Sequence, residues 1–389
     1  MIRKNAKSKR EFDFLFVLPF LYPDNVGYVN KHAAFLAGEL SKLGYSTSVL
    51  ILPEAAKMIA RAKLDKGVIS VRKFLLAFAY YSLFNSSIYY RFFRYVYSHV
   101  ANNPFDFTMF LGTKIIYNDI PSLNDAKRII FNTWEAACFL SNKVSPDKCF
   151  YIVYHNHEND FPPLAKLIND TYNAGFNLIA TTEPIRQKFS LNPMCKMFPA
   201  IDPKKLNQES DPERKIRNTI LIQLSKDKIK GANYAIDAIQ QLLDRNQNLL
   251  IYSFGNYDAP TKMNERWSHF NNISDGDLKQ LYGKCEIYVS PAVEAGIPGS
   301  AVEAMINGCA TITTDVSGAR ELVEPGVNGI IIPPGDSYAI VSSVENLLSH
   351  VEIIKLLGRN GKMIKYKFSI ENMTKTFLGA VDFYEGEKE

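Results

Sequence analysis

One stretch in the second half of the chain decides its fold: SPAVEAGIPGSAVEAM, residues 290–305. An apolar run of strand length ends at Ser290, and helical spacing resumes at Ser300, so the stretch predicts a strand, a glycine-containing loop and a helix. Such a helix start presents unpaired backbone N–H groups and the positive end of the helix dipole, which together bind phosphate. Glu303 lies one turn into this helix, within reach of a polar group such as a ribose diol. From these residues alone, an ordinary turn capped by Ser300 is an equally good interpretation.

The residues around this stretch continue the alternation of strand and helix. In the second half, strand-length apolar runs separated by helical spacing occur at 219–224, 249–254, 287–290, 310–314 and 329–332. The first half opens with a strand at 12–18, a loop, helical spacing from Val29 to Leu43 and a strand at 46–52. Further strands are expected at 128–132, 149–154 and 178–182. We therefore expect an α/β protein with two doubly wound, Rossmann-like domains that face each other across a ligand cleft.

Length and charge limit the function classes. A chain of 389 residues suits two large domains rather than a lone binding module, and prolines with mixed charge at 199–217 predict a linker near residue 205. Five of the 45 Lys and Arg residues fall in the first ten positions, which leaves 40 to balance the 40 Asp and Glu residues. An electroneutral body argues against a nucleic-acid partner, which requires a basic surface on the folded domain.

Cysteine usage and apolar runs predict a location. The five scattered cysteines show neither a CxxC pair nor a metal-ligand spacing, which fits a reduced, cytoplasmic compartment. The basic and apolar start imitates a signal peptide, but Glu11 and Asp13 interrupt it and no small-residue cleavage site follows. No run reaches the ~18 to 20 apolar residues that span a bilayer. The aromatic segment 73–100, with Arg91 and Arg94, suits core helices or a membrane surface.

The second half resembles a known enzyme family over some forty residues. Its segments Glu303–Met305, Asn307–Ala310, Thr314–Val323, Gly326–Gly329 and Pro333–Asp336 resemble, in order and without gaps, retaining glycosyltransferases of the GT-B fold, family 4. The resemblance is weaker elsewhere but reaches both halves. It implies an acceptor-binding domain at 1–205, a domain for a nucleoside diphosphate sugar at 206–368, and a last helix within 369–389 that returns to the first domain. The implied donor-binding residues are Gly27, Lys226, Gly296, Gly299, Ser300, Ala301 and Glu303.

The lysine-rich loop departs from the family pattern. The family holds the donor diphosphate with an arginine followed by a Lys-Gly pair. Lys230-Gly231 matches that pair, but the arginine is absent, so Lys226 or Lys228 would have to replace it with a point charge. A solvated loop is the alternative interpretation of these lysines. The lysines and the resemblance together imply that no metal and no other cofactor is required.

The paired glutamates also depart from the pattern. The family separates them by seven residues, whereas eight lie between Glu294 and Glu303. Either the loop carries one inserted residue, or Ala295 occupies the first position. Glu303 remains the expected ribose contact in both alignments, and Glu294 is the expected catalytic glutamate in only one of them.

Two polar clusters could bind a sugar or a metal. The strand at 149–154 runs into His155–Asp160, where the resemblance implies that His157 or His155 acts near the transferred sugar. Two histidines with Glu158 and Asp160 could also form a metal site, although helix-spaced ligands are missing. The Asp275–Asp277 segment imitates a metal-binding Asp-x-Asp, but Ser274 before helical spacing predicts an N-cap and first-turn acids instead.

The leading hypothesis is a retaining glycosyltransferase with His157, Lys230 and Glu294 as catalytic residues. It would move a sugar from a nucleoside diphosphate sugar to a glycan or lipid-linked saccharide, without nucleic acid. The basic tail and the aromatic segment predict a peripheral position at the inner face of the cell membrane. The two departures motivate an alternative, a non-catalytic GT-B scaffold or partner subunit. A phosphorylase or sugar epimerase is a third hypothesis.

Overall fold

The computed structural model divides into two compact units. The first comprises the chain up to Thr181, Phe189–Met197 and the end from Thr374, and the second comprises Thr182–Lys188 and Phe198–Met373. The linker expected near residue 205 lies outside the described residues, as do the N-terminal basic tail, Gly27 and the aromatic segment 73–100. The structure describes residues 12–18, 28–52, 114–117, 120–160, 162–202, 211–258, 264–271 and 273–387.

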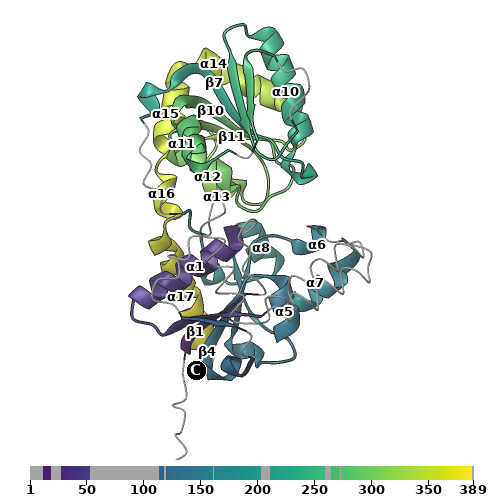
Figure 1. The fold of residues 1–389 in the computed structure, drawn as a ribbon, viewed down its shortest axis with the longest axis vertical. Helices are drawn as coiled ribbons and strands as arrows, with labels where there is room; N and C mark the ends of the chain where they lie inside the picture. Colours follow the sequence, from purple (N-terminus) through teal and green to yellow (C-terminus); the bar gives the residue numbers. More distant parts are fainter. Residues whose placement is uncertain are drawn as a thin grey trace, which may run out of the picture. The chain divides into compact units, whose positions relative to one another are not determined.

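The first unit contains a parallel sheet with strand order β3-β2-β1-β4-β5-β6 (Figure 1). The central strand β1 is an almost continuous apolar run, as expected for a parallel strand covered on both faces. Its strands are β1 (Phe12–Leu18), β2 (Thr47–Ile51), β3 (Lys114–Tyr117), β4 (Ala126–Phe131), β5 (Cys149–Val153) and β6 (Asn177–Ala180). Its helices include α1 (Tyr28–Lys42), α5 (Trp134–Leu140), α6 (His157–Asp160) and α7 (Ala165–Tyr172).

The last helix, α17 (Ile370–Gly386), contributes its larger part to the first unit. Figure 1 shows this part alongside β1 and β4. The ring of Phe377 is fully buried and lies 5.9 Å from that of Phe14. The Arg128 guanidinium donates to both carboxylate oxygens of Glu385 at 2.6 and 2.7 Å. Apolar burial and a two-point ion pair therefore hold the end of the chain on the first sheet.

The second unit contains a parallel sheet with strand order β12-β11-β10-β7-β8-β9. The predicted architecture of two Rossmann-like parallel sheets is therefore confirmed. Its strands are β7 (Ile216–Gln223), β8 (Leu250–Phe254), β9 (Trp267–Phe270), β10 (Cys285–Ser290), β11 (Ala310–Thr314) and β12 (Ile330–Ile332). Its helices include α8 (Glu183–Lys188), α10 (Ala232–Arg245), α11 (Asp275–Lys284), α12 (Gly299–Ile306), α13 (Ala319–Leu322), α14 (Ser337–Ser349), α15 (Val351–Gly361) and α16 (Ile364–Lys367).

Alternate residues of the central strands serve the two faces of this sheet. Ile287 and Val289 of β10 join the apolar core that contains α10 and α14. Tyr288, between them, must point to the opposite face because side chains alternate along a strand. There its hydroxyl reaches Ser300 of α12 at 2.8 Å. Figure 1 shows α10 on one side of these strands and α11 and α12 on the other.

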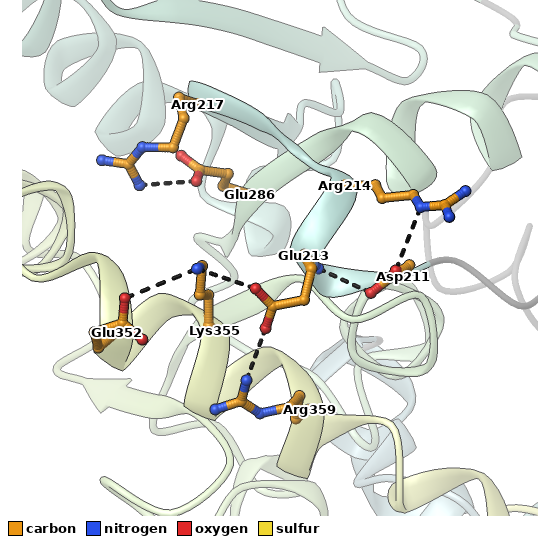
Figure 2. Close-up of polar contacts among 8 residues, drawn as sticks. All are labelled: Asp211, Glu213, Arg214, Arg217, Glu286, Glu352, Lys355 and Arg359. Atoms are coloured by element: carbon orange, nitrogen blue, oxygen red, sulfur yellow. Dashed lines mark hydrogen bonds and ion pairs between the residues drawn. The ribbon is translucent and has the colours of Figure 1, made fainter.

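A group of ion pairs holds the beginning of β7 (Figure 2). The Glu213 carboxylate, just before β7, lies 3.0 Å from the Lys355 ammonium and 2.7 Å from the Arg359 guanidinium, both on α15. Arg217 pairs with the buried Glu286 carboxylate of β10 at 2.8 Å. The Glu213 hydrogen bond and charge raise the pKa of Lys355. Because these pairs lie at the amino end of β7, they leave its carboxyl end to other contacts.

Candidate functional site

The strand order of the second unit reverses between β7 and β10, so we expect its ligand crevice there. From β7 the chain adds β8 and β9 on one side, and β10 then begins the series on the other side. In doubly wound sheets, ligands bind beyond the carboxyl ends of the strands where the order reverses. These ends are Gln223 and Ser290, followed by the loops at 224–231 and 291–298. The candidate site therefore combines the lysine-rich loop with the stretch that decided the fold.

The two loops are bound to each other through their backbones. The carbonyl oxygen of Ile229 accepts hydrogen bonds from the N–H groups of Val293 at 2.8 Å and Glu294 at 3.2 Å. Gly231 ends the lysine loop with φ +68°, and a Cβ built there would lie 1.9 Å from the carbonyl oxygen of Pro291. Only glycine permits this conformation and this approach together. The fold thus brings the loop of Lys230 together with the loop of Glu294 and Gly296.

The start of α12 presents backbone donors to this crevice. Pro298 is the N-cap and has no capping side chain, and its carbonyl accepts from the N–H groups of Ala301 at 3.0 Å and Val302 at 3.2 Å. Within the described residues, the N–H groups of Gly299 and Ser300 have no partner. These two groups and the helix dipole form a site suited to an anion. The N–H group of Ala301, an expected donor contact, is used inside the protein.

Ser300 does not cap its helix, contrary to the alternative interpretation of the sequence. Its hydroxyl donates to Gln223 Oε1 at 2.8 Å and accepts from the Tyr288 hydroxyl at 2.8 Å. The Tyr282 hydroxyl donates to the Ser300 carbonyl at 3.2 Å. Sequence reasoning missed Gln223 and Tyr288, because no local pattern links a glutamine at a strand end or a tyrosine inside a strand to Ser300.

Glu303 lies one turn into α12 and is buried, with 6% of its surface exposed. Burial raises the pKa of the neighbouring Tyr288 hydroxyl, and the Glu303 charge acts in the same direction. The loop that carries Gly296 packs closely on the loop after β11. A Cβ at Gly318 would lie 2.4 Å from the Gly296 carbonyl oxygen, so the two loops need a glycine at this contact.

Lys226 has different surroundings from Lys230. Its ammonium lies 3.0 Å from the Asp258 carboxylate, and both side chains are more than half exposed. The backbone N–H group of Lys226 donates to Asn256 Oδ1 at 3.3 Å. Both partners of Lys226 therefore belong to the loop after β8. Lys230 is half-buried and directly precedes Gly231. Of these two lysines, Lys230 belongs to the segment that contacts the Glu294 loop.

In the first unit, His157 opens α6 just after β5. Its ring centroid lies 4.0 Å from that of His155, and Glu158 accepts a hydrogen bond from the Tyr172 hydroxyl at 3.4 Å. The strand order of this sheet reverses between β1 and β4, one strand away from β5. The loop after β4 contains the buried Asn132, a residue that sequence reasoning missed.

The described residues also bear on metal and thiol chemistry. Among them, no group of three or more His, Cys, Asp and Glu side chains could hold a metal ion. Ser274 accepts a hydrogen bond from the Asp277 N–H group at 3.1 Å, which confirms the predicted N-cap of α11.

All five cysteines are free thiols, and burial raises the pKa of Cys138 and Cys149 to about 12. At neutral pH these two thiols are therefore poor nucleophiles.

The segment that builds the site has known relatives. Residues 219–350 match the family model of glycosyl transferases group 1. This group 1 segment contains β7 from Thr219 onward, β8 to β12, both loops of the crevice and all of α12. Parts of the chain are also 26% identical over 167 residues to the capsular polysaccharide biosynthesis glycosyltransferase CapM of Staphylococcus aureus, covering 39% of this chain and 44% of CapM.

Other comparisons cover different shares of the chain. The chain is 28% identical over 116 residues to the putative glycosyltransferase EpsD of Bacillus subtilis, which is 29% of this chain and 30% of EpsD. It thus spans less than half the length of these curated relatives. Among solved structures, HepE from Anabaena in complex with UDP and glucose superposes with a TM-score of 0.64 at 13% identity, over 96% of this chain and all of HepE. The structure of TarM superposes with a TM-score of 0.65 at 11% identity, over 96% of this chain and 99% of TarM. The chain has the GT-B glycosyltransferase fold.

Within the described residues, no helix is both long enough and apolar enough to cross a membrane.

Proposed function

We propose that this chain is a retaining glycosyltransferase of family 4 that uses a nucleoside diphosphate sugar. The observation that carries the proposal is the contact between two loops at the reversal point of the second sheet. One loop carries Lys230 and the other carries Glu294 and leads to the start of α12. This is also the segment that matches glycosyl transferases group 1.

The chemistry of these groups suits the departure of a diphosphate. When the bond between the anomeric carbon and the diphosphate breaks, negative charge grows on the phosphate oxygens. The Lys230 ammonium and the N–H groups of Gly299 and Ser300 can stabilise that charge without reorganising. Glu303 can accept hydrogen bonds from the ribose diol. No metal enters this scheme, because the cation and the backbone donors supply the positive potential.

The GT-B fold by itself does not require catalysis, so a scaffold is the alternative. The arginine that the resemblance implies is missing, and the Lys226 ammonium lies beside Asp258. A scaffold would have no need to keep Lys230, the open start of α12 and the buried Glu303 in one segment. These features favour a working donor site.

A thermal-shift experiment tests the donor site. The unfolding midpoint of the full chain is measured with UDP, GDP and ADP, each with and without EDTA, beginning with UDP because HepE was solved with it. A ligand at a hundredfold excess over its Kd stabilises the native state by about 2.7 kcal/mol, which raises the midpoint by several degrees. We expect one nucleotide to give a shift that survives EDTA. No shift with any of the three would favour the scaffold.

We further propose that the acceptor is a glycan or a lipid-linked saccharide and that the chain works in the cytoplasm at the inner membrane face. CapM, one of its relatives, is named for capsular polysaccharide biosynthesis. The membrane part is tested with liposomes that contain anionic lipid, using the full chain and a variant that lacks residues 1–10 and carries Arg91→Ala and Arg94→Ala. Equal binding of the two proteins would refute it.

A further inference from the structure

A chain of hydrogen bonds inside the second unit ends on a side chain at the crevice. It begins at Tyr288, which is fully buried in the middle of β10. The Tyr288 hydroxyl lies 2.8 Å from Ser300 Oγ, and Ser300 Oγ lies 2.8 Å from Gln223 Oε1. Gln223 is the last residue of β7 and is half-buried at the point where the strand order reverses. We call these three residues the Tyr288 relay.

In the Tyr288 relay, the hydroxyl hydrogens determine which group donates each hydrogen bond and which group accepts it. Burial keeps the Tyr288 hydroxyl protonated, and within the described residues its hydrogen has one acceptor, Ser300. A buried hydroxyl hydrogen without an acceptor is costly, so Tyr288 donates and the Ser300 hydroxyl turns its own hydrogen to Gln223. A glutamine amide accepts only through its oxygen. The relay therefore decides which end of the Gln223 amide faces Ser300.

The other end of that amide carries two N–H donors. Within the described residues the Gln223 NH₂ group has no hydrogen-bond partner, whereas the Gln223 amide oxygen accepts a hydrogen bond from the Ser300 hydroxyl. It stands at the carboxyl end of β7, directly before the lysine loop that contacts the Glu294 loop. Two fixed donors directly before the lysine loop and in contact with the start of α12 suit phosphate oxygens, which are acceptors only.

We propose that the Gln223 NH₂ group donates to the phosphate oxygens of the nucleoside diphosphate and that Tyr288 is the positioning residue that orients it. This inference rests on the proposed function and adds two residues to its donor site. Without the Tyr288 hydroxyl, Ser300 can accept from Gln223 as well as donate to it. The amide then turns over in part of the population and presents its oxygen to the phosphate, which repels it.

Two tyrosine variants separate positioning from packing. Tyr288→Phe keeps the buried ring and removes the first donor of the relay. Tyr282→Phe is the matched control: its ring lies 5.9 Å from that of Tyr288, and its hydroxyl donates to the backbone carbonyl of the same Ser300 at 3.2 Å. The control loses a hydrogen bond to α12 but leaves the orientation of the amide unchanged. Gln223→Glu tests the donors directly, because it replaces the NH₂ group with an acceptor of equal size.

The readout is the Kd of the full chain for the nucleoside diphosphate that raises the wild-type midpoint, and for the matching nucleoside without phosphate. Loss of one oriented hydrogen bond should weaken nucleoside diphosphate binding about fivefold to tenfold in Tyr288→Phe, and more than about tenfold in Gln223→Glu. Binding of the nucleoside should change less than about twofold in both. Tyr282→Phe should bind both ligands within about twofold of wild type.

Two results would overturn the inference and leave the proposed function standing. One is wild-type affinity of Tyr288→Phe for the nucleoside diphosphate. The other is an equal loss for nucleoside and nucleoside diphosphate, which would show a packing defect. If the wild type binds none of UDP, GDP and ADP, the proposed function and the inference both fall.

Discussion

Replacing Gly231 with alanine should both destabilise the second unit and abolish donor binding. Its φ of +68° costs an alanine about 1 kcal/mol. The added Cβ would also lie 1.9 Å from the Pro291 carbonyl oxygen, so the two loops must separate by more than an ångström. That movement breaks the hydrogen bonds from Val293 and Glu294 to Ile229, each of which contributes about 1 kcal/mol. We expect a loss of about 3 kcal/mol, or roughly 6–12 °C in the midpoint.

The two tryptophans allow this loss to be measured in the second unit alone. Trp134 belongs to the first unit and Trp267 to the second, and both are buried. In a Trp134→Phe background, urea unfolding followed by fluorescence therefore reports on Trp267. Gly326→Ala is the matched control, since Gly326 has φ +78° in the same unit and nothing lies within 4 Å of its added Cβ.

The control should lose about 1 kcal/mol and bind nucleotide normally. Equal stability of the two alanine variants, with normal nucleotide binding in both, would refute the close contact between the loops.

Three further predictions concern the lysine loop, Glu303 and Asp13. Lys230→Ala should abolish sugar transfer measured with radiolabelled donor. Lys226→Ala should retain most of that activity, because the Lys226 ammonium of the wild type is exposed and lies 3.0 Å from the Asp258 carboxylate. Near-wild-type turnover in Lys230→Ala would contradict the assignment. Glu303→Gln should raise the Kd of the ribonucleotide about tenfold more than that of the 2′,3′-dideoxynucleotide, and equal effects in titration calorimetry would exclude the ribose contact. The Ser46 N–H hydrogen bond lowers the pKa of Asp13, so its stabilising effect is present above the unfolded pKa of about 4 and is lost as pH falls through the folded pKa. Asp13→Asn should therefore be less stable than wild type at pH 7, and urea titrations should show the difference shrinking on acidification; a constant difference would contradict it.

Most strands could be predicted because their signals are local. The apolar runs at Phe12–Leu18 and Ala310–Thr314 are strands with the predicted bounds. The edge strand Trp267–Phe270 was missed, because two of its residues, Ser268 and His269, are polar and only one of its four is buried. A sequence window recognises strands by continuous burial, and an edge strand lacks it.

The candidate site could be predicted only in part. Lys230, Glu294 and Glu303 stand out because each lies in a motif of consecutive residues. Gln223 and Tyr288 carry no such signal, since a polar residue at a strand end and an aromatic residue inside a strand are common in any α/β protein. Their significance depends on a hydrogen-bond path that joins positions 223, 288 and 300.

The sequence by itself determined the class of fold and the segment in which donor chemistry is expected. Periodicity and turn residues act over a few neighbours along the chain, so they can be read without a structure. Only the tertiary structure shows that the loops of Lys230 and Glu294 share hydrogen bonds. It also shows that the Ser300 hydroxyl bonds to Gln223 instead of capping its helix, and that Lys226 forms an ion pair with Asp258. These contacts depend on strand order and on the face to which each side chain points. Both are settled by packing between residues far apart in the chain, where no local pattern records the partner.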